Sequence, residues 1–475
     1  MFMRLIYDDK LAQAAYVIGC QKTGEAVVID PERDIDRYLK LAKSNGLKIT
    51  ATAETHIHAD FLSGSRELAD AVGAKVYVSD EGDADWKYQW LDGYDHRLLK
   101  DGDSFHIGNI EIKAVHTPGH TPEHLAYLVI DHGGGADEPM GMASGDFVFV
   151  GDLGRPDLLE SAAGHAGAME PSARRLRKSV QELAGLEDYL QIWPAHGAGS
   201  ACGKSLGAVP SSTLGYERRH NEAMMKADDE QAFVDFILSG QPEPPVYFAD
   251  MKRLNKVGPP VLGDLPKPNQ MKAEDLRDLD TSKVAVIDTR PWDEFRAGHV
   301  PGSLFLPLST SFNTDAGSLV GIDDDIYLIC KPGQVEEAVR DLIRIGFDHI
   351  KGWVDQSTIF GFAGDGHKLK SLEQVDVSKA ADLIDDGKVN VLDVRRQTEY
   401  ENDGHIDGAT NIAHTRLARR MDEVPTDKPL LVHCRSGARS SRAAAYLQSK
   451  GLDVINLDGG MLAWQKNQKT QTATA

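Results

Sequence analysis

The chain has 475 residues, of which 41% are hydrophobic and 26% are charged, and this balance is ordinary for a water-soluble protein with several hydrophobic cores. Its formal net charge of −21 argues against nucleic acid and anionic membranes as main partners, because no basic stripe offsets the acidic excess. No apolar run is long enough to span a membrane.

The first residues and the cysteines indicate the compartment. Residues 1–8 are predicted to form a first strand and not a signal peptide. The four cysteines are too few for a disulfide framework in a chain of this length, so we expect a reducing, cytoplasmic environment. Cys20 ends the mostly apolar stretch 16–20 and is expected to be a buried core thiol.

Up to residue 245, strand patterns alternate with helical patterns. Residues 26–29 and 48–53 have the apolar character of strands, and residues 34–44 have the periodicity of a helix. Such a sequence predicts an α/β fold in which two sheets lie between helices, an αββα sandwich. The candidate metal loops would then lie at one edge of the sheets.

Histidines and aspartates with metal-ligand spacing occur at four places in this part of the chain. The stretch 55–61 reads Thr-His-Ile-His-Ala-Asp-Phe, and three further landmarks follow it in order. The candidate ligands are His56, His58, Asp60, His120, Asp146 and His196. A single His-x-His is weak evidence, but four landmarks in this order predict a metal site.

The residues alone leave two ligand sets open. His56, His120 and Asp146 would form the two-histidine, one-carboxylate face that binds non-haem Fe(II) and leaves coordination positions free. Alternatively, His56, His58 and His120 would bind zinc, with Asp146 reaching in and a metal-bound water as the nucleophile. Phe61 cannot coordinate a metal, which favours one ion over two.

The stretch 55–61 resembles the Thr-His-x-His-x-Asp-His loop of the dinuclear metallo-β-lactamase fold, with Phe61 in place of the last histidine. Through residues 151–157, the resemblance extends to the persulfide dioxygenase branch of that superfamily. In that branch the iron ligands match His56, His120 and Asp146. The resemblance therefore implies one Fe(II) per chain. It also implies that three further residues orient the ligands, namely His58, Asp60 and His196.

Two more residues near this site are candidates for function. Arg155 would either anchor an anionic persulfide or sulfite, or form a structural ion pair with Asp157. Cys202 lies six positions after His196, in a loop that should fold near the mouth of the metal site. Cys202 would either carry sulfur or be a bystander.

Seven prolines between residues 240 and 269 mark the end of the metal domain. Because proline cannot continue a helix or a central strand, we expect an extended linker here. The predicted organisation has four parts: the metal domain at residues 1–245, the linker at 246–269, and two small α/β domains at 270–370 and 371–475.

A cysteine loop lies near the end of the chain at residues 433–440, between an expected strand and an expected helix. The helix start and the side chains of Arg435 and Arg439 favour an anionic sulfur on Cys434. The loop and its flanks resemble a rhodanese domain, whose active loop has the form Cys-x4-Arg. The related phosphatase loop is one residue longer and ends in Arg, where this chain has Ser440. Sulfur transfer is therefore expected, not dephosphorylation.

The same pattern occurs once before, so the rhodanese-like domain is predicted to be duplicated. Asp393 lies 105 residues after Asp288, and His405 lies 106 residues after His299. The earlier copy keeps Cys330, but its loop carries features that oppose an anionic sulfur, namely Pro332, Val335, Glu336 and Glu337. We expect Cys330 to be inactive and its domain to be a spacer or docking surface.

Over nearly its full length the chain is similar to the multidomain persulfide dioxygenase/sulfurtransferases. The resemblance implies a sulfide-detoxifying enzyme that oxidises a small-molecule persulfide with O2 to sulfite and a thiol. Cys434 would then form or use thiosulfate. Two rivals remain, a zinc thioesterase of the glyoxalase II type fused to sulfur-carrier domains and a non-catalytic sulfur-relay scaffold. The sequence does not identify the thiol carrier. It also does not decide whether the chain forms a homo-oligomer.

Overall fold

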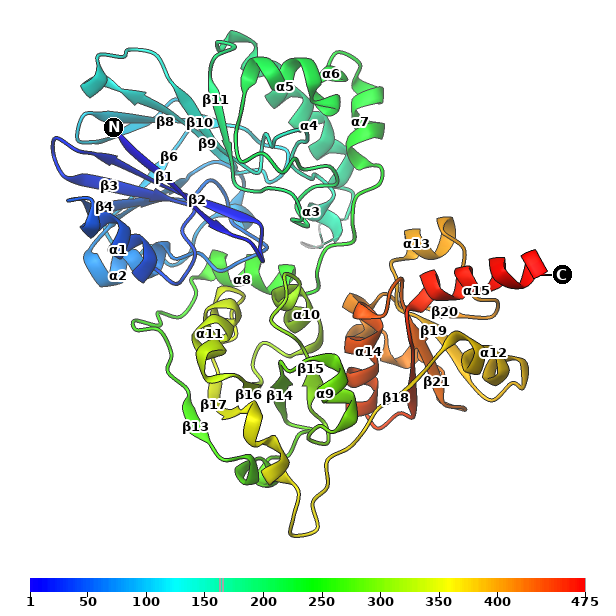
Figure 1. The fold of residues 1–475 in the computed structure, drawn as a ribbon. Coiled ribbons are helices and arrows are strands. Elements are labelled where there is room, and N and C mark those ends of the chain that lie inside the picture. The colour runs from blue at the N-terminus through cyan, green and yellow to red at the C-terminus, as the bar shows by residue number, and fades with distance from the viewer. Residues whose placement is uncertain (162–163, 165, 475) are drawn as a thin grey trace. The chain divides into compact units, whose positions relative to one another are not determined.

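The computed structural model of the protein describes residues 1–161, 164 and 166–474. The chain divides into two compact units (Figure 1). The first unit comprises residues 1–265 and 343–346, and the second comprises residues 266–342 and the residues from 347 onward. Among the described residues, no helix combines the length and the apolar character that crossing a membrane would require.

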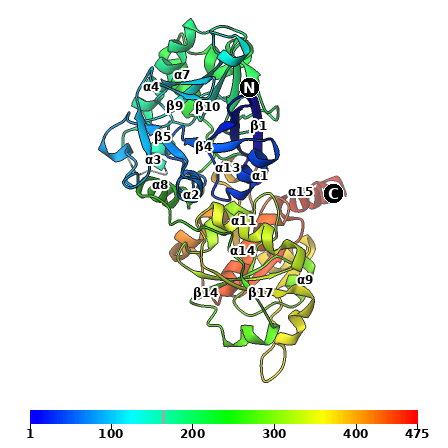
Figure 2. The same ribbon diagram turned by 90° about the vertical axis from the view of Figure 1, so that its left-hand side faces the viewer.

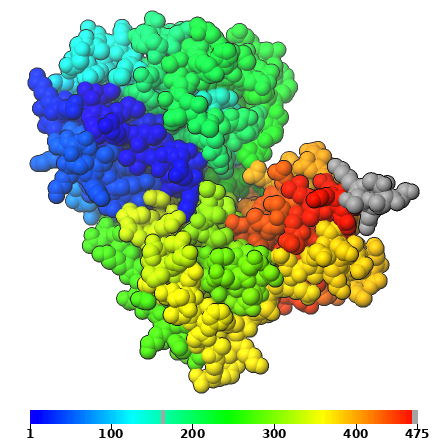
Figure 3. Space-filling model, in the orientation of Figure 1, coloured from blue at the N-terminus to red at the C-terminus, as the bar shows by residue number. Residues whose placement is uncertain are grey.

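The first unit contains two six-stranded sheets. The strands of the first sheet, in spatial order, are β1 (Phe2–Asp8), β2 (Gln13–Cys20), β3 (Glu25–Ile29), β4 (Lys48–Ala53), β5 (Lys75–Ser79) and β6 (His96–Leu99). Those of the second are β12 (Ser212–Thr213), β11 (Gln191–Pro194), β10 (Gly141–Gly145), β9 (Leu125–Asp131), β8 (Ile110–His116) and β7 (Ser104–Ile107). Figure 3 shows the N-terminal strand, in dark blue, at the surface of this unit, as expected for the edge of a sheet.

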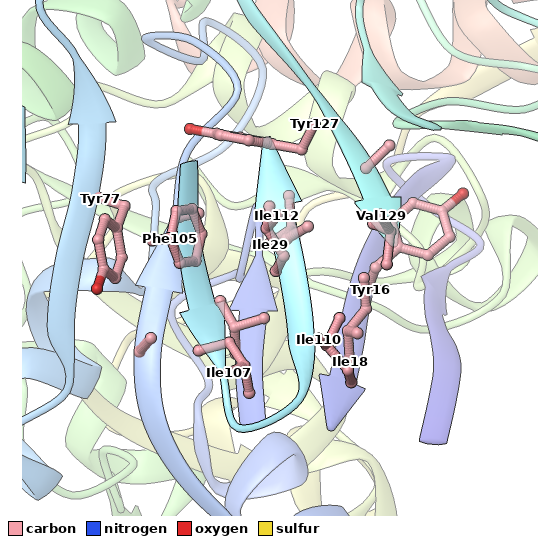
Figure 4. Packing of buried hydrophobic residues seen from close by; sticks show 14 of the residues in the cluster. Tyr16, Ile18, Ile29, Tyr77, Phe105, Ile107, Ile110, Ile112, Tyr127 and Val129 are labelled. Atoms are coloured by element: carbon pink, nitrogen blue, oxygen red, sulfur yellow. The ribbon is translucent and has the colours of Figure 1, made fainter. Parts of the chain in front are cut away.

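The two sheets face each other across the main core of the unit. Side chains alternate between the faces of a strand, so Tyr16 and Ile18 of β2 enter the core between the sheets while Val17 points to the opposite face. Figure 4 shows Phe105 of β7 beside Tyr77 of β5, and their rings stack with centroids 3.8 Å apart. Burial of this aromatic and aliphatic surface is what joins the sheets.

Helices cover the outer faces of both sheets. Val17 and its neighbours pack against α1 and α2, and the outer face of the second sheet packs against α4 and α7 (Figures 1 and 2). The helices of the unit are α1 (Asp36–Ser44), α2 (Ser65–Val72), α3 (Leu158–Ser161), α4 (Met169–Glu182), α5 (Leu214–His220), α6 (Glu222–Met225), α7 (Glu230–Leu238) and α8 (Phe248–Val257). The predicted αββα sandwich is therefore confirmed.

The expectation of an extended linker is wrong for α8, which lies inside the range 246–269. The prolines flank a proline-free stretch from 246 to 258, and this stretch forms a helix that buries Phe248 and Met251. Asn255 of α8 donates hydrogen bonds to the carbonyls of His58 and Phe61, at 2.8 and 2.7 Å. The first unit thus extends to residue 265, and α8 supports the loop that carries the candidate ligands.

The second unit contains two five-stranded parallel sheets with the same strand order. The first sheet runs β13 (Asn269–Met271), β17 (Ile350–Asp355), β16 (Asp325–Cys330), β14 (Val284–Asp288) and β15 (Leu304–Phe305). The second runs β18 (Glu373–Val375), β22 (Val454–Leu457), β21 (Leu430–His433), β19 (Asn390–Asp393) and β20 (Thr410–Asn411). Each sheet pairs in parallel throughout, so the two copies share one fold.

Helices connect these parallel strands, as crossovers between parallel strands require. They are α9 (Trp292–Ala297), α10 (Phe312–Leu319), α11 (Val335–Arg344), α12 (Val377–Asp385), α13 (Gln397–Asn402) and α14 (Ala438–Ser449), whereas α15 (Gly460–Thr474) follows the last strand. The repeated Asp-x-Arg motif has the same role in both copies. Arg290 pairs with Asp288, and Arg395 pairs with Asp393, each in the buried interior at 2.7 and 2.6 Å. The motif that revealed the duplication is therefore a structural ion pair.

Candidate metal centre and cysteine loop

The loop that follows β4 carries His56, and a network of hydrogen bonds holds its backbone. Asp30 accepts hydrogen bonds from the backbone N–H and the hydroxyl of Thr55, at 2.7 and 2.8 Å. The Thr55 hydroxyl in turn lies 3.0 Å from Nδ1 of His56. The backbone N–H of Ile57 donates to Glu123 at 2.8 Å. These contacts fix the imidazole so that its Nε2 atom is free to bind a metal.

His56, His120 and Asp146 come together as predicted. Each offers one donor atom, and the three atoms lie within 4.8 Å of one another in the buried interior. Nε2 of His120 is 3.5 Å from a carboxylate oxygen of Asp146, and its Nδ1 bonds to the carbonyl of Arg155 at 3.1 Å. Two imidazole nitrogens and one carboxylate on one side of a site suit Fe(II) and also zinc.

Both imidazoles of this set are held in the form that binds metals. Burial, together with the neighbouring histidines, lowers the pKa of His56 well below its usual value. Burial also lowers the pKa of His120, although Asp146 opposes the shift. A neutral imidazole presents a lone pair, so the two side chains are ready to coordinate a cation at neutral pH.

His58 does not join this set. Its Nε2 atom lies 3.1 Å from Asp30 and 3.0 Å from Glu54, and its ring packs against Phe61 with centroids 4.4 Å apart. Burial disfavours the charged ring, but the two carboxylates outweigh it and raise the pKa of His58 well above its usual value. The zinc set that required His58 is therefore not assembled here. His58 supports the loop through Asp30, which also holds Thr55.

Asp60 and His196 gather beside the first three ligands together with Cys202. Nε2 of His196 is 3.2 Å from Asp60 and 3.3 Å from the second carboxylate oxygen of Asp146. The donor atoms of Asp60, His196 and Cys202 lie within 4.8 Å of one another. His196 thus contacts the first ligand set through Asp146, and Asp60 and His196 lie close to Cys202.

The sequence gives little reason to single out His124, yet it supports the site. Its Nε2 atom accepts a hydrogen bond from the backbone N–H of Asp146 at 3.1 Å, and its Nδ1 contacts Thr117 at 2.7 Å. Its ring stacks on that of His56 with centroids 5.2 Å apart. The signal for this role in the sequence is a second histidine four residues after His120.

Arg155 forms the ion pair that was one of its two expected roles. Its guanidinium makes two hydrogen bonds to Asp157, at 3.0 and 2.6 Å, and a third to the carbonyl of Ala201 at 2.6 Å. The side chain is fully buried. The structure therefore does not support Arg155 as an anion anchor. It connects residues 151–157 to the loop that carries Cys202.

Cys202 lies near the metal site, as expected, but it is not an exposed thiol. Only 3% of the residue is accessible. Burial and the nearby carboxylates of Asp60 and Asp146 raise its pKa well above the usual value. A thiolate at this position therefore needs a cation beside it.

Cys434 lies between β21 and α14, as the sequence predicts. The backbone N–H of Gly437 donates to its sulfur at 3.2 Å. Arg439 makes two hydrogen bonds to Glu399 of α13, at 2.6 and 2.7 Å, whereas Arg435 is exposed. A Cβ on Gly460 would lie 2.4 Å from the carbonyl of Cys434, so the segment after β22 can approach this loop only with glycine there.

The corresponding loop of the first copy is different. Cys330 ends β16 and is fully buried, and Pro332 begins a short turn before α11. Burial, with Asp355 and Asp288 nearby, raises the pKa of Cys330 to about 12. A thiol with this pKa is protonated at neutral pH and is a poor sulfur acceptor.

Two protein families match the chain. The Metallo-beta-lactamase superfamily matches residues 8–196, and the Rhodanese-like domain matches residues 272–354 and 376–467. The crystal structure of a metallo-beta-lactamase from Staphylococcus aureus subsp. aureus COL is 41% identical, with a TM-score of 0.68. The alignment covers 74% of this chain and 98% of that one.

Curated relatives match separate parts of the chain. The persulfide dioxygenase ETHE1 of Bos taurus is 28% identical over 201 residues, which are 41% of this chain and 68% of that protein. The thiosulfate sulfurtransferase GlpE of Shewanella oneidensis is 35% identical over 99 residues, which are 21% of this chain and 97% of that protein. The hydroxyacylglutathione hydrolase of Rhodospirillum rubrum is 36% identical over 162 residues, which are 34% of this chain and 56% of that protein. The chain thus spans little more than half of that hydrolase.

Proposed function

The chain belongs to the metallo-beta-lactamase superfamily and carries two rhodanese-like domains, and we propose that it couples a persulfide dioxygenase to a thiosulfate sulfurtransferase. The cofactor of the first activity is one Fe(II) per chain, held by His56, His120 and Asp146. The observation that carries this proposal is that the Nε2 atom of His58 contacts Asp30 and Glu54. The candidate ligands that remain together are two histidines and one carboxylate.

In the first reaction a persulfide, O2 and water give a thiol, sulfite and two protons. Fe(II) would supply the one-electron chemistry that lets O2 react with a closed-shell sulfur compound. The side chains of this chain supply position and surroundings. Thr55 and the carbonyl of Arg155 orient the two imidazoles. A buried apolar cluster beside the loop limits the access of water to the site. It is formed by Ile57, Trp86 and Leu159.

In the second reaction Cys434 carries a sulfane sulfur as a persulfide. Sulfite attacks the terminal sulfur, the sulfur–sulfur bond of the persulfide breaks, and the thiolate of Cys434 leaves with the electron pair while thiosulfate forms. The N–H of Gly437 and the start of α14 stabilise that thiolate, and Arg439 adds positive charge. The GlpE relative, a sulfurtransferase, supports this assignment for the second rhodanese-like copy.

A hydrolase is the second candidate, because the hydroxyacylglutathione hydrolase of Rhodospirillum rubrum is 36% identical. A zinc thioesterase would have to use the same His56, His120 and Asp146 without His58. The persulfide dioxygenase relative favours oxidation at this site, although its identity is lower.

Metal analysis and oxygen uptake test the proposal. Protein purified without O2 should contain about one iron per chain and should consume O2 with a glutathione or coenzyme A persulfide. His120→Gln and Asp146→Asn should lose iron and O2 uptake together. Full activity of an iron-free zinc form, or hydrolysis of thioesters without O2 uptake, would overturn the dioxygenase assignment.

A further inference from the structure

Three metal-ligating side chains lie together on the outer face of the second sheet, and none of them belongs to the candidate metal centre. They are His106 of β7, Glu111 of β8 and His132, and their donor atoms lie within 4.8 Å of one another. His106 and Glu111 are directly opposite each other in the antiparallel pair of β7 and β8. His132 follows the end of β9, the other neighbour of β8. The register of the strands therefore brings the three side chains together.

The alternation of side chains along β7 and β8 directs His106 and Glu111 away from the core. In the core between the sheets lie their four neighbours, Phe105, Ile107, Ile110 and Ile112 (Figure 4). β7 is an edge strand of its sheet, and His106 is exposed there. The side chains of His132 and Glu111 are 36% and 22% exposed. A cation can therefore reach all three from the solvent.

A tight turn fixes the orientation of the His132 ring. The side chain of Asp131 accepts a hydrogen bond from the N–H of Gly134 at 3.2 Å, and Gly135 has a left-handed φ of 83°, which glycine adopts without strain. This turn places the carbonyl of Ala136 3.0 Å from Nδ1 of His132. Because a carbonyl oxygen can only accept, Nδ1 carries a hydrogen, and Nε2 is the atom that faces Glu111.

Nε2 of His132 and a carboxylate oxygen of Glu111 are 2.9 Å apart. In a neutral ring this Nε2 has a lone pair, and two acceptors at this distance repel each other unless a proton or a metal ion contacts both. A second proton gives an ion pair, and the hydrogen bond to Glu111 does raise the pKa of His132. A zinc ion bound at about 2.0–2.2 Å by each donor would hold the two atoms roughly 3.0–3.5 Å apart, close to the distance observed.

The other two side chains favour the metal over the proton. Hydrogen bonds from His132 and Ser104 lower the pKa of Glu111, so its carboxylate is charged at neutral pH. The ring of His106 lies nearly parallel to that of His132, with centroids 6.4 Å apart. A proton between His132 and Glu111 would give His106 no part, whereas a metal ion uses all three donors. Two imidazoles and one carboxylate suit Zn2+ and disfavour Mg2+ and Ca2+, which prefer oxygen ligands.

We propose that His106, Glu111 and His132 form a surface site for one Zn2+ ion per chain, with water completing the coordination. The donors come from β7, from β8 and from the turn after β9, so the ion would link three successive segments at the exposed edge of the second sheet. The site shares no residue with the candidate iron ligands, and the inference does not rest on the proposed function.

Histidine labelling with diethylpyrocarbonate tests the site in the iron-loaded, full-length protein under nitrogen. The reagent modifies accessible imidazole nitrogens, and a bound metal blocks them. At constant pH, Zn2+ at about ten times its half-saturating concentration should slow the labelling of His106 and His132 roughly tenfold, with one half-saturating concentration for both. Peptide mass spectrometry resolves each residue. His349, exposed and 3.7 Å from Asp325, is the surface control and should be labelled equally fast with and without Zn2+.

Matched variants identify the ligands. Glu111→Gln keeps both histidines and should raise the half-saturating Zn2+ concentration by at least about tenfold. Asp137→Asn is its control, because that carboxylate lies 3.8 Å from Nδ1 of His132 but is no member of the set, and it should leave protection unchanged. His132→Gln should leave His106 unprotected at the Zn2+ concentration that protects it in the wild type, because a single imidazole holds the ion weakly.

Labelling of His106 and His132 that Zn2+ leaves unchanged would show an ion pair only and would overturn the site. Protection of His106 that persists in folded His132→Gln, or equal protection of His349, would overturn it as well, since zinc would then bind single surface histidines. Circular dichroism checks the fold of each variant. None of these measurements uses O2 uptake or sulfur products, so a failure of this site is distinguishable from a failure of the dioxygenase assignment.

Discussion

Arg439 and Glu399 form a two-point ion pair at the entrance to the Cys434 loop, with nitrogen–oxygen distances of 2.6 and 2.7 Å. Glu399 comes from α13 and Arg439 from the first turn of α14, so the pair fixes the guanidinium beside the sulfur. Two-point pairs of this kind define geometry as well as charge. The arginine of the Cys-x4-Arg loop therefore depends on a carboxylate that the motif does not contain.

Glu399→Gln should reduce sulfur transfer from thiosulfate to a thiol. Without the carboxylate the guanidinium loses its fixed position, and kcat/KM should fall about tenfold, which corresponds to roughly 1.4 kcal/mol of transition-state stabilisation. Glu401→Gln, on the same helix but exposed, is the matched control and should have little effect. An equal loss of activity in both variants would show that the pair has no special role.

Cys330→Ser should be nearly silent in the same assay. Because the pKa of Cys330 is about 12, roughly one thiol in ten thousand is ionised at pH 8, and burial restricts access to it. Its alkylation by iodoacetamide should be slow at pH 8. As long as the pH is below the pKa, the rate should increase about tenfold for each unit by which the pH is raised. Peptide mass spectrometry after timed alkylation would measure this. Rapid labelling at pH 7, or a large loss of turnover in folded Cys330→Ser, would make the first copy catalytic.

Asp30→Asn should weaken metal binding without removing a ligand. Asp30 accepts both hydrogen bonds from Thr55 and contacts His58, so its charge holds the loop that presents His56. Loss of such support lowers metal affinity by about 10- to 100-fold. Competition with a chromogenic chelator would report the change. Asp70→Asn, exposed on α2, serves as the control, and unaltered affinity in Asp30→Asn would refute the supporting role.

Asn255→Ala should destabilise the first unit by about 1–3 kcal/mol. The side-chain amide satisfies the carbonyls of His58 and Phe61 and the N–H of Ser63, and their loss leaves buried groups unpaired. Chemical denaturation followed by tryptophan fluorescence would give the difference. Arg253→Ala, exposed on the same helix, should change stability by less than about 0.5 kcal/mol. Equal stability of the two variants would mean that α8 does not support the loop.

The proximity of the first set of candidate ligands could be predicted because each of them closely follows a strand. His56, His120 and Asp146 each lie within four residues of the end of a strand, β4, β8 and β10, so motif order alone indicates that they meet. The duplication was equally visible, since each Asp-x-Arg pair is made within three residues. Features that depend on residues close together in the chain can be predicted from the sequence.

The long-range partners of His58, Arg155 and Cys202 could not be predicted in the same way. Each depends on partners from distant segments: Asp30 for His58, Ala201 for Arg155, and Asp60 for Cys202. α8 was missed because the prolines around it dominate the composition of its segment. Such contacts become visible only when the fold brings the segments together.

The division of labour between the two units is tested most directly by the products of Cys434→Ser. Cys434 is a thiol in the rhodanese loop, and the metal ligands belong to the other unit. Persulfide-dependent O2 uptake should therefore continue at close to the wild-type rate, while the product shifts from thiosulfate to free sulfite. Thiosulfate formed by the variant at the wild-type rate, after correction for the spontaneous reaction of sulfite with persulfide, would contradict the account.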